Sequence, residues 1–185
     1  MLPPNLHLRQ ATLSDLKSLE ALIAVSARRL GAAYYSAAQI EGALGGAFGV
    51  DTMLIRDGTY FLITDTDTQG SIVACGGWSR RRTLFGSDAR AERDESWLDP
   101  RTEAAKIRAF FVNPAYARQG LGRAILERSE AEARQAGFTS LTLMATLPGV
   151  PFYERQGYVA GPAINYPLPG GLEIRFVPMS KQAQC

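Results

Sequence analysis

The sequence contains a single histidine, His7, and only two cysteines, Cys75 and Cys185. A metal site with several histidine ligands is therefore excluded, and a Ser-His-Asp triad would have to use His7. Two cysteines provide no disulfide framework, which is typical of a reducing compartment, and Cys75 lies in an apolar run expected in the core. These absences predict no metal and leave acid–base chemistry to other side chains.

The sequence also lacks long apolar runs and an excess of one charge. No run is long enough to span a membrane, and residues 1–5 lack the basic and apolar regions of a signal peptide, so we expect a cytoplasmic protein. The net charge is only +2. The arginines at 80–82 are followed by acidic residues, which favours a mixed, solvated loop over a nucleic-acid surface. We expect neither a membrane nor a nucleic acid as partner.

The 185 residues, 46% hydrophobic and 21% charged, are typical of one globular domain. Hydrophobic periodicity and capping residues predict a strand at 6–10, a helix from the capping box of Thr12 and Asp15 to about Leu30, and a shorter helix opened by Ser36. A strand pair at 60–64 and 71–78 follows, and then a polar loop at about 79–103. We see no repeat and no linker, and predict a single domain over 1–185.

The most informative stretch is 110–126, which combines an apolar strand, a turn with Gly120 and Gly122, and a helix. The first N–H groups of a helix have no internal partner and the helix dipole is positive there, so this place favours phosphate. Glycines let a ligand approach the backbone closely. The helix should bury Leu121 and Ile125 and expose Glu127 and Glu130 on its polar face.

Residues 106–145 form a predicted β-α-β unit with parallel strands. A short helix at 152–155 and a final pair of strands at 158–159 and 172–177 follow, joined through a loop rich in proline and glycine. The glycine turn matches nucleotide motifs poorly, because Ile125 stands where the dinucleotide pattern needs a small residue and residues 144–146 offer no acid for a ribose. The lysine of the P-loop pattern is also absent.

Three blocks, at 107–112, 118–126 and 151–158, occur in the order and spacing of the GNAT superfamily of acetyl-CoA-dependent N-acetyltransferases, which the sequence resembles over most of its length. The resemblance implies a mixed α/β fold, with a mostly antiparallel sheet flanked by helices. One parallel pair of strands is then splayed at the cofactor site. It also implies acetyl-CoA as cosubstrate.

The resemblance assigns roles to particular residues. Backbone amides around the glycine turn would hold the CoA pyrophosphate, in either of two motif registers, and the strand before it would bind pantetheine and offer an oxyanion donor. Thr146 stands where the family often has asparagine. The implied cofactor-binding residues are Phe110, Phe111, Val112, Arg118, Gln119, Gly120, Leu121, Gly122, Arg123, Ala124, Thr146 and Phe152.

Tyr153 matches the tyrosine general acid of the family. A phenol with a pKa of about 10 is protonated at neutral pH and can donate to a departing thiolate, although spacing alone equally allows a core tyrosine. No general base can be assigned. The carboxylates before the motif strand are Glu95, Asp99 and Glu103, and the residues placed by analogy near the acceptor are Tyr34, Tyr35 and Trp78.

The leading hypothesis is acetyl transfer from acetyl-CoA to a primary amine of a small molecule or protein, by direct attack on the thioester. A GNAT-like domain that binds CoA as a sensor or scaffold is the alternative, and a nucleotide-binding module is a third interpretation. A homodimer is expected only by analogy with the family.

Overall fold

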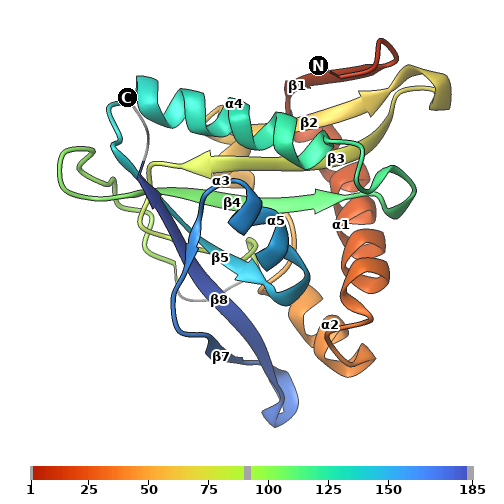
Figure 1. Cartoon of the computed structure of the whole chain (residues 1–185). Coiled ribbons are helices and arrows are strands. Elements are labelled where there is room, and N and C mark those ends of the chain that lie inside the picture. The colour runs from red at the N-terminus through yellow and green to blue at the C-terminus, as the bar shows by residue number, and fades with distance from the viewer. Residues whose placement is uncertain (1, 90–92, 183–185) are drawn as a thin grey trace.

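The computed structural model describes residues 2–89 and 93–182, in which eight strands form one sheet flanked by helices (Figure 1). The strands are β1 (Leu6–Gln10), β2 (Tyr60–Asp65), β3 (Ser71–Ser79), β4 (Ala105–Val112), β5 (Ser140–Thr146), β6 (Val159–Ala160), β7 (Ile164–Pro167) and β8 (Glu173–Gln182). The main helices are α1 (Leu16–Gly31), α2 (Ala37–Leu44), α3 (Thr52–Arg56), α4 (Leu121–Gln135) and α5 (Val150–Arg155). Cys185 lies outside the described residues.

The strand order is β1-β2-β3-β4-β5-β8-β6, with β7 also paired to β8. Only β4 and β5 pair in parallel, and the other neighbours are antiparallel. The parallel pair is joined through α4, as the β-α-β pattern predicts. The predicted mixed sheet with one parallel pair is therefore confirmed.

Alternate strand residues build two cores on opposite faces of the sheet. In β2, Phe61 and Ile63 join the core under α4, whereas Tyr60 and Leu62 join the core under α1, α2 and α3. His7 lies exposed in β1, and Cys75 is buried, as its apolar run predicts.

The structure corrects the prediction for residue Glu130. The periodicity placed Glu130 on the solvated face of α4, but it is buried and accepts hydrogen bonds from the Lys181 ammonium at 2.8 Å and the Tyr158 hydroxyl at 2.9 Å. Segments from the C-terminal end of the chain cover this side of α4, which local periodicity cannot reveal. Glu127 is exposed as predicted and forms an i,i+4 ion pair with Arg123 at 2.7 Å.

Two further elements differ from the sequence prediction. Helix α3 was not predicted because five residues are too short for a periodic signal, although Leu54 and Ile55 are buried. The C-terminal loop contains β7, which pairs with the first half of β8, while Val159 of β6 lies opposite Ser180. The final strand is therefore longer than the predicted 172–177.

A bulge in β4 separates β4 from β5. The register of β3 and β4 shifts between Cys75 and Gly77, and Ala109 has a φ of 55°, in the left-handed region. Gly76 makes room for this bulge, because a Cβ there would lie 2.7 Å from the Phe110 ring. Pairing of β4 with β5 is confined to Ala105 and the next residue, after which the strands diverge (Figure 1).

Asp15→Asn should lower the free energy of unfolding at neutral pH by about 1 kcal/mol, because it removes the acid of the capping box. The side chain accepts hydrogen bonds from Arg9 and Thr12, which hold the pKa of Asp15 at about 2, below its ordinary 3.8. This contribution is present above about pH 4 and is lost as the pH falls toward 2. Urea unfolding of the variant and the parent at several pH values measures it.

The exposed Asp67→Asn on the β2–β3 turn is the matched control, and it should change the free energy of unfolding by less than about 0.5 kcal/mol. A stability difference for Asp15→Asn that stays constant as the medium is acidified would contradict this role of the carboxylate.

Candidate functional site

A cavity of about 650 Å³ opens where β4 and β5 diverge. Phe110, Phe152 and Tyr153 line it on the α4 face of the sheet. Phe111 and Phe48 line it on the opposite face. Since neighbouring residues of a strand face opposite sides, Phe110 and Phe111 reach the two halves. The cavity therefore connects the two faces of the sheet through the splay.

The glycine turn forms one end of this cavity. Arg118 and Gly120 have left-handed φ values of 66° and 84°, and α4 begins directly after them. The N–H of Ala124 already donates to the Gly120 carbonyl at 3.0 Å, and the N–H of Ala117 donates to Pro114. Within the described chain, the amides of 118–123 have no such acceptor. Left-handed turns at a helix N-terminus aim such free N–H groups at an anion.

Arginine side chains add positive charge at this end. Arg118, Arg123 and Arg155 line the cavity and are exposed. The guanidinium of Arg123 pairs with Glu127, whereas Arg118 and Arg155 form no ion pair with the described residues. Guanidinium groups beside free amides are well suited to bind phosphate oxygens. Of the twelve predicted cofactor residues, only Gln119 and Ala124 do not line the cavity.

The glycine turn abuts the aromatic wall that carries Tyr153. A Cβ at Gly122 would lie 3.4 Å from the Phe152 ring and 3.9 Å from Val112. The ring centroid of Phe152 is 4.9 Å from that of Tyr153, and the Phe110 centroid is 6.2 Å from it. The anion-binding end and the Tyr153 ring are thus separated by one aromatic side chain.

Tyr153 is buried on α5, where Phe110, Phe152 and Tyr158 contact its ring edge to face. Burial raises the pKa of its phenol above the ordinary 10, so the hydroxyl stays protonated at neutral pH. In the part of the chain that the structure describes, this hydroxyl makes no hydrogen bond. Its proton is therefore available to a molecule in the cavity.

The strand residues offer unequal backbone donors. The Val112 N–H donates to the Ser26 hydroxyl at 3.2 Å. Phe111 lies opposite the buried Cys75 in the β3 register, whereas Phe110 has no partner in that register. Thr146 lines the cavity at the end of β5, across from these residues. Phe110 is accordingly the strand residue best placed to offer its backbone to a ligand.

The sequence model described as "Acetyltransferase (GNAT) family" matches residues 27–158. The chain belongs to the GNAT acetyltransferase family. Solved structures share its fold. A GCN5-related N-acetyltransferase from Rhodopseudomonas palustris superposes with a TM-score of 0.71 at 19% identity, covering 98% of each chain. No curated protein matches the sequence.

Two more solved structures have the same fold. The ribosomal-protein-S18-alanine N-acetyltransferase from Escherichia coli gives a TM-score of 0.59 at 17% identity, covering 97% of this chain and 95% of that one. The PaiA N-acetyltransferase from Thermoplasma acidophilum, solved with coenzyme A, gives 0.62 at 13% identity, covering 96% and 98%. At these identities the likeness establishes the fold of this GNAT protein and not its substrate.

The carboxylates considered as general bases lie away from the GNAT cavity. Glu95 pairs with Arg93, Asp99 with Arg101 and Glu103 with Arg82, and none of the three acids lines the cavity. The hydrogen bond from the Arg101 side chain also lowers the pKa of Asp99. The site thus brings no predicted base to the cavity. Over residues 2–89 and 93–182, no cluster of metal ligands occurs and no helix is long and apolar enough to cross a membrane.

Among the residues expected near the acceptor, only Tyr35 lines the cavity. Its hydroxyl donates to the Arg175 carbonyl and accepts from the Leu147 N–H, both at 2.7 Å, and burial raises its pKa to about 12. Tyr34 is exposed outside the cavity, and Trp78 packs on Phe138 under α4. Tyr35 therefore bridges β8 and the segment before α5 through its two hydrogen bonds.

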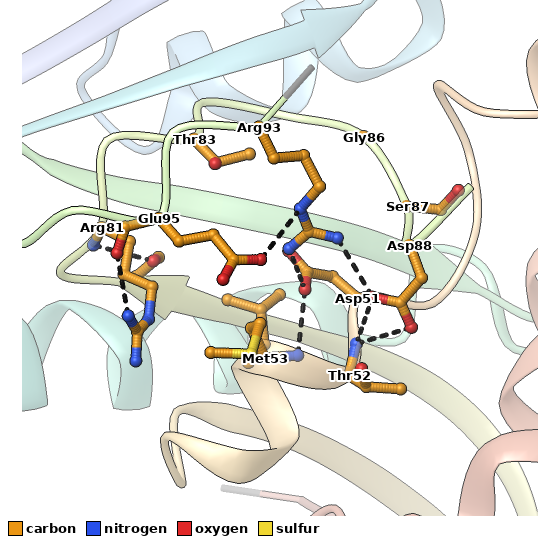
Figure 2. A network of polar contacts seen from close by, with 12 residues as sticks. Asp51, Thr52, Met53, Arg81, Thr83, Gly86, Ser87, Asp88, Arg93 and Glu95 are labelled. Carbon is orange, nitrogen blue, oxygen red and sulfur yellow. Dashed lines mark hydrogen bonds and ion pairs between the residues drawn. The ribbon is translucent and has the colours of Figure 1, made fainter. Parts of the chain in front are cut away.

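A buried ionic network was not predicted (Figure 2). The Asp51 carboxylate accepts from Arg108 at 2.8 Å, from Arg93 at 2.6 Å and from the Met53 N–H at 3.0 Å. Arg108 also donates to the carbonyls of Thr83 at 2.7 Å and Gly86 at 2.9 Å. The only sequence signal was an arginine inside an apolar strand. The network fixes a loop whose residues 84–86 line the cavity.

Proposed function

We propose that this protein transfers the acetyl group of acetyl-CoA to a primary amine by direct attack on the thioester. One observation carries the proposal: the cavity through the β4–β5 splay joins the free amides of 118–123 to the protonated Tyr153 hydroxyl. Family membership supports acetyl-CoA as the donor. A single domain over 1–185, a cytoplasmic location and a homodimer stay predictions.

We place the donor in the cavity in one direction. The CoA pyrophosphate would bind the amides of 118–123 and the guanidinium of Arg118. The pantetheine arm would run along the β4 backbone at residues 110–112, facing Thr146 across the splay. The thioester would then lie beside Tyr153. This order follows the sequence of groups along the cavity wall.

The reaction needs three groups. A neutral amine attacks the carbonyl carbon and forms the C–N bond, and the resulting oxyanion accepts a hydrogen bond from the backbone N–H of Phe110. The C–S bond then breaks, and Tyr153 gives its proton to the departing thiolate. The surplus proton of the new amide leaves through water, which also reprotonates Tyr153. The products are the N-acetylated amine and CoA.

Gly122→Val should weaken CoA binding at least about tenfold, a loss of roughly 1.4 kcal/mol. A Cβ at this position already touches Phe152, so the added methyl groups must extend toward the amides that would hold the pyrophosphate. Calorimetric titration with CoA measures the affinity. Gly46→Val is the control, because a Cβ there meets nothing within 4 Å.

Three results separate the competing functions. Release of thiol from acetyl-CoA in the presence of an amine supports the transferase. Tight CoA binding without turnover of any amine would instead favour the sensor or scaffold. A melting temperature raised by ATP or NAD and not by CoA would favour a nucleotide-binding module.

Unchanged CoA affinity in Gly122→Val would contradict the proposed pyrophosphate site at the glycine turn and would place the anion site elsewhere.

A further inference from the structure

The acceptor half of the cavity is built from apolar and aromatic side chains. On the face of the sheet opposite α4, the Phe48 ring lies 6.0 Å from both Phe111 and Phe176, and Phe85 lies 5.6 Å from Phe176. All four rings line the cavity, and the larger aliphatic residues that line it beside them are Leu30, Leu84 and Met144. Two of these pairs are edge to face and one is tilted, and such an arrangement of rings favours a further aromatic ring as ligand.

The described residues of this wall offer no negative charge. Among the described residues that line the cavity there is no aspartate, glutamate, histidine or lysine, and the charged side chains are all arginines. The one at the acceptor half is Arg108, whose buried guanidinium is already bonded to Asp51 and two carbonyls. An ammonium group would therefore enter an apolar space without a counter-charge from the described lining residues, next to groups of its own sign.

The same wall is held rigidly. Besides the two bonds from Arg108, the backbone N–H and hydroxyl of Ser87 both donate to the Gly46 carbonyl, at 2.8 Å and 3.0 Å. The Asp88 N–H donates to Val50 at 3.0 Å, and its carboxylate pairs with Arg93 (Figure 2). Hydrogen bonds therefore hold residues 84–86 at both ends. A rigid cavity wall of this kind discriminates among ligands by shape and does not adapt to each of them.

We propose that the acceptor is an aryl-bearing monoamine that binds as the neutral amine, and not a polyamine or a lysine side chain. This inference rests on the proposed acetyl transfer and specifies its substrate class. The apolar wall and the arginines lower the pKa of a bound ammonium, so they supply the neutral nucleophile without a general base. A second ammonium on the acceptor would remain unpaired in the apolar half, which lowers its binding.

Thiol release from acetyl-CoA with a panel of amines tests the proposal. The panel contains 2-phenylethylamine, 2-cyclohexylethylamine, putrescine, spermidine and Nα-acetyl-lysine amide. We expect kcat/KM for 2-phenylethylamine to exceed kcat/KM for putrescine and for spermidine by at least about 100-fold. It should exceed kcat/KM for 2-cyclohexylethylamine by several-fold. Turnover that is faster with the polyamines or with the lysine derivative would overturn this inference and leave acetyl transfer standing. No turnover of any amine, with CoA bound, would overturn acetyl transfer itself.

Two positions on α1 provide matched variants. Leu30 lines the cavity and is 38% exposed, whereas Val25 is 46% exposed and lies outside it. Leu30→Glu should raise kcat/KM for putrescine about tenfold and lower that for 2-phenylethylamine, because it adds the missing counter-charge. Val25→Glu should change neither value. Equal effects of the two substitutions would show that overall charge, and not the cavity wall, sets the preference.

The pH dependence provides a readout that a structural defect would not move. Two 2-phenylethylamines that differ in pKa through ring substitution should give kcat/KM profiles whose rise follows the pKa of each free amine. A rise at one fixed pH for both amines would reveal a titrating base of the protein.

A second pair of variants repeats the charge test if Leu30→Glu fails to fold. Leu84 also lines the cavity, so Leu84→Glu should raise kcat/KM for putrescine relative to Leu84→Gln.

Discussion

Tyr153→Phe should lower kcat for acetyl transfer by roughly 10²- to 10⁴-fold, the range expected when a general acid is removed. The affinity for CoA should stay nearly unchanged, because phenylalanine keeps the ring contacts with Phe110, Phe152 and Tyr158. Only the hydroxyl is lost, and it makes no hydrogen bond within the described chain. Thiol release at saturating acetyl-CoA and calorimetric titration with CoA measure the two quantities.

Tyr158→Phe is the matched control for this experiment. Tyr158 lies 5.7 Å from Tyr153, but its hydroxyl donates to Glu130 and it does not line the cavity. Its loss should lower stability and leave kcat within about threefold, because one buried hydrogen bond is removed away from the reacting atoms. Normal turnover by Tyr153→Phe with an accepted amine would show that another group protonates the thiolate.

The pH dependence of the parent protein provides a second check. Burial raises the pKa of Tyr153 above its ordinary value, so the acid form persists through and above neutral pH. Activity should therefore not decline between about pH 7 and pH 9 through loss of this proton. A decline in that range that disappears in Tyr153→Phe would contradict the assignment.

Local patterns predicted the geometry of the glycine turn, whereas its role in holding a donor stays a prediction. The free amides of 118–123 follow from two glycines before a helix whose apolar face repeats at Leu121 and Ile125, and all of this lies within a short stretch of chain. The capping boxes at Thr12 and Ser36 are equally local. Such features depend on neighbours that the sequence itself displays.

The cavity wall at 84–86 and the buried side of α4 could not be predicted in the same way, because they depend on contacts between distant segments. Asp51 meets Arg108 across 57 positions of sequence, and Glu130 meets Lys181 across 51. The Asp51 side chain caps the N-terminus of the short helix α3, because it accepts a hydrogen bond from the Met53 N–H. The carboxylates Glu95 and Glu103 looked available in the sequence, since their arginine partners become visible only in the fold.

Asp51→Asn should lower the free energy of unfolding by about 3–5 kcal/mol, the usual result of breaking a buried ion pair. The amide leaves the guanidinium of Arg108 buried without a counter-charge, and it weakens the bond to Arg93. For a chain of this length the melting temperature should fall by roughly 10 °C. Urea denaturation and thermal unfolding measure both changes.

Asp88→Asn separates the buried pair from the exposed one on the same arginine. The Asp88 side chain is 44% exposed and lies 3.0 Å from Arg93, so its replacement should cost less than about 1 kcal/mol. Equal losses of unfolding free energy in the two variants would mean that the exposed Asp88–Arg93 pair stabilises the protein as much as the buried Asp51 pairs do.

The Asp51→Asn variant also tests whether the ionic network positions the cavity wall at 84–86. Asp51 holds Arg108, and Arg108 holds the carbonyls of Thr83 and Gly86, so Asp51→Asn should loosen the wall at 84–86. KM for the amine should then rise several-fold at a temperature where the variant is folded, while CoA affinity stays near the parent value, because the glycine turn is held by other contacts. A parallel loss of both affinities would mean that Asp51 supports the fold as a whole and not the acceptor wall in particular.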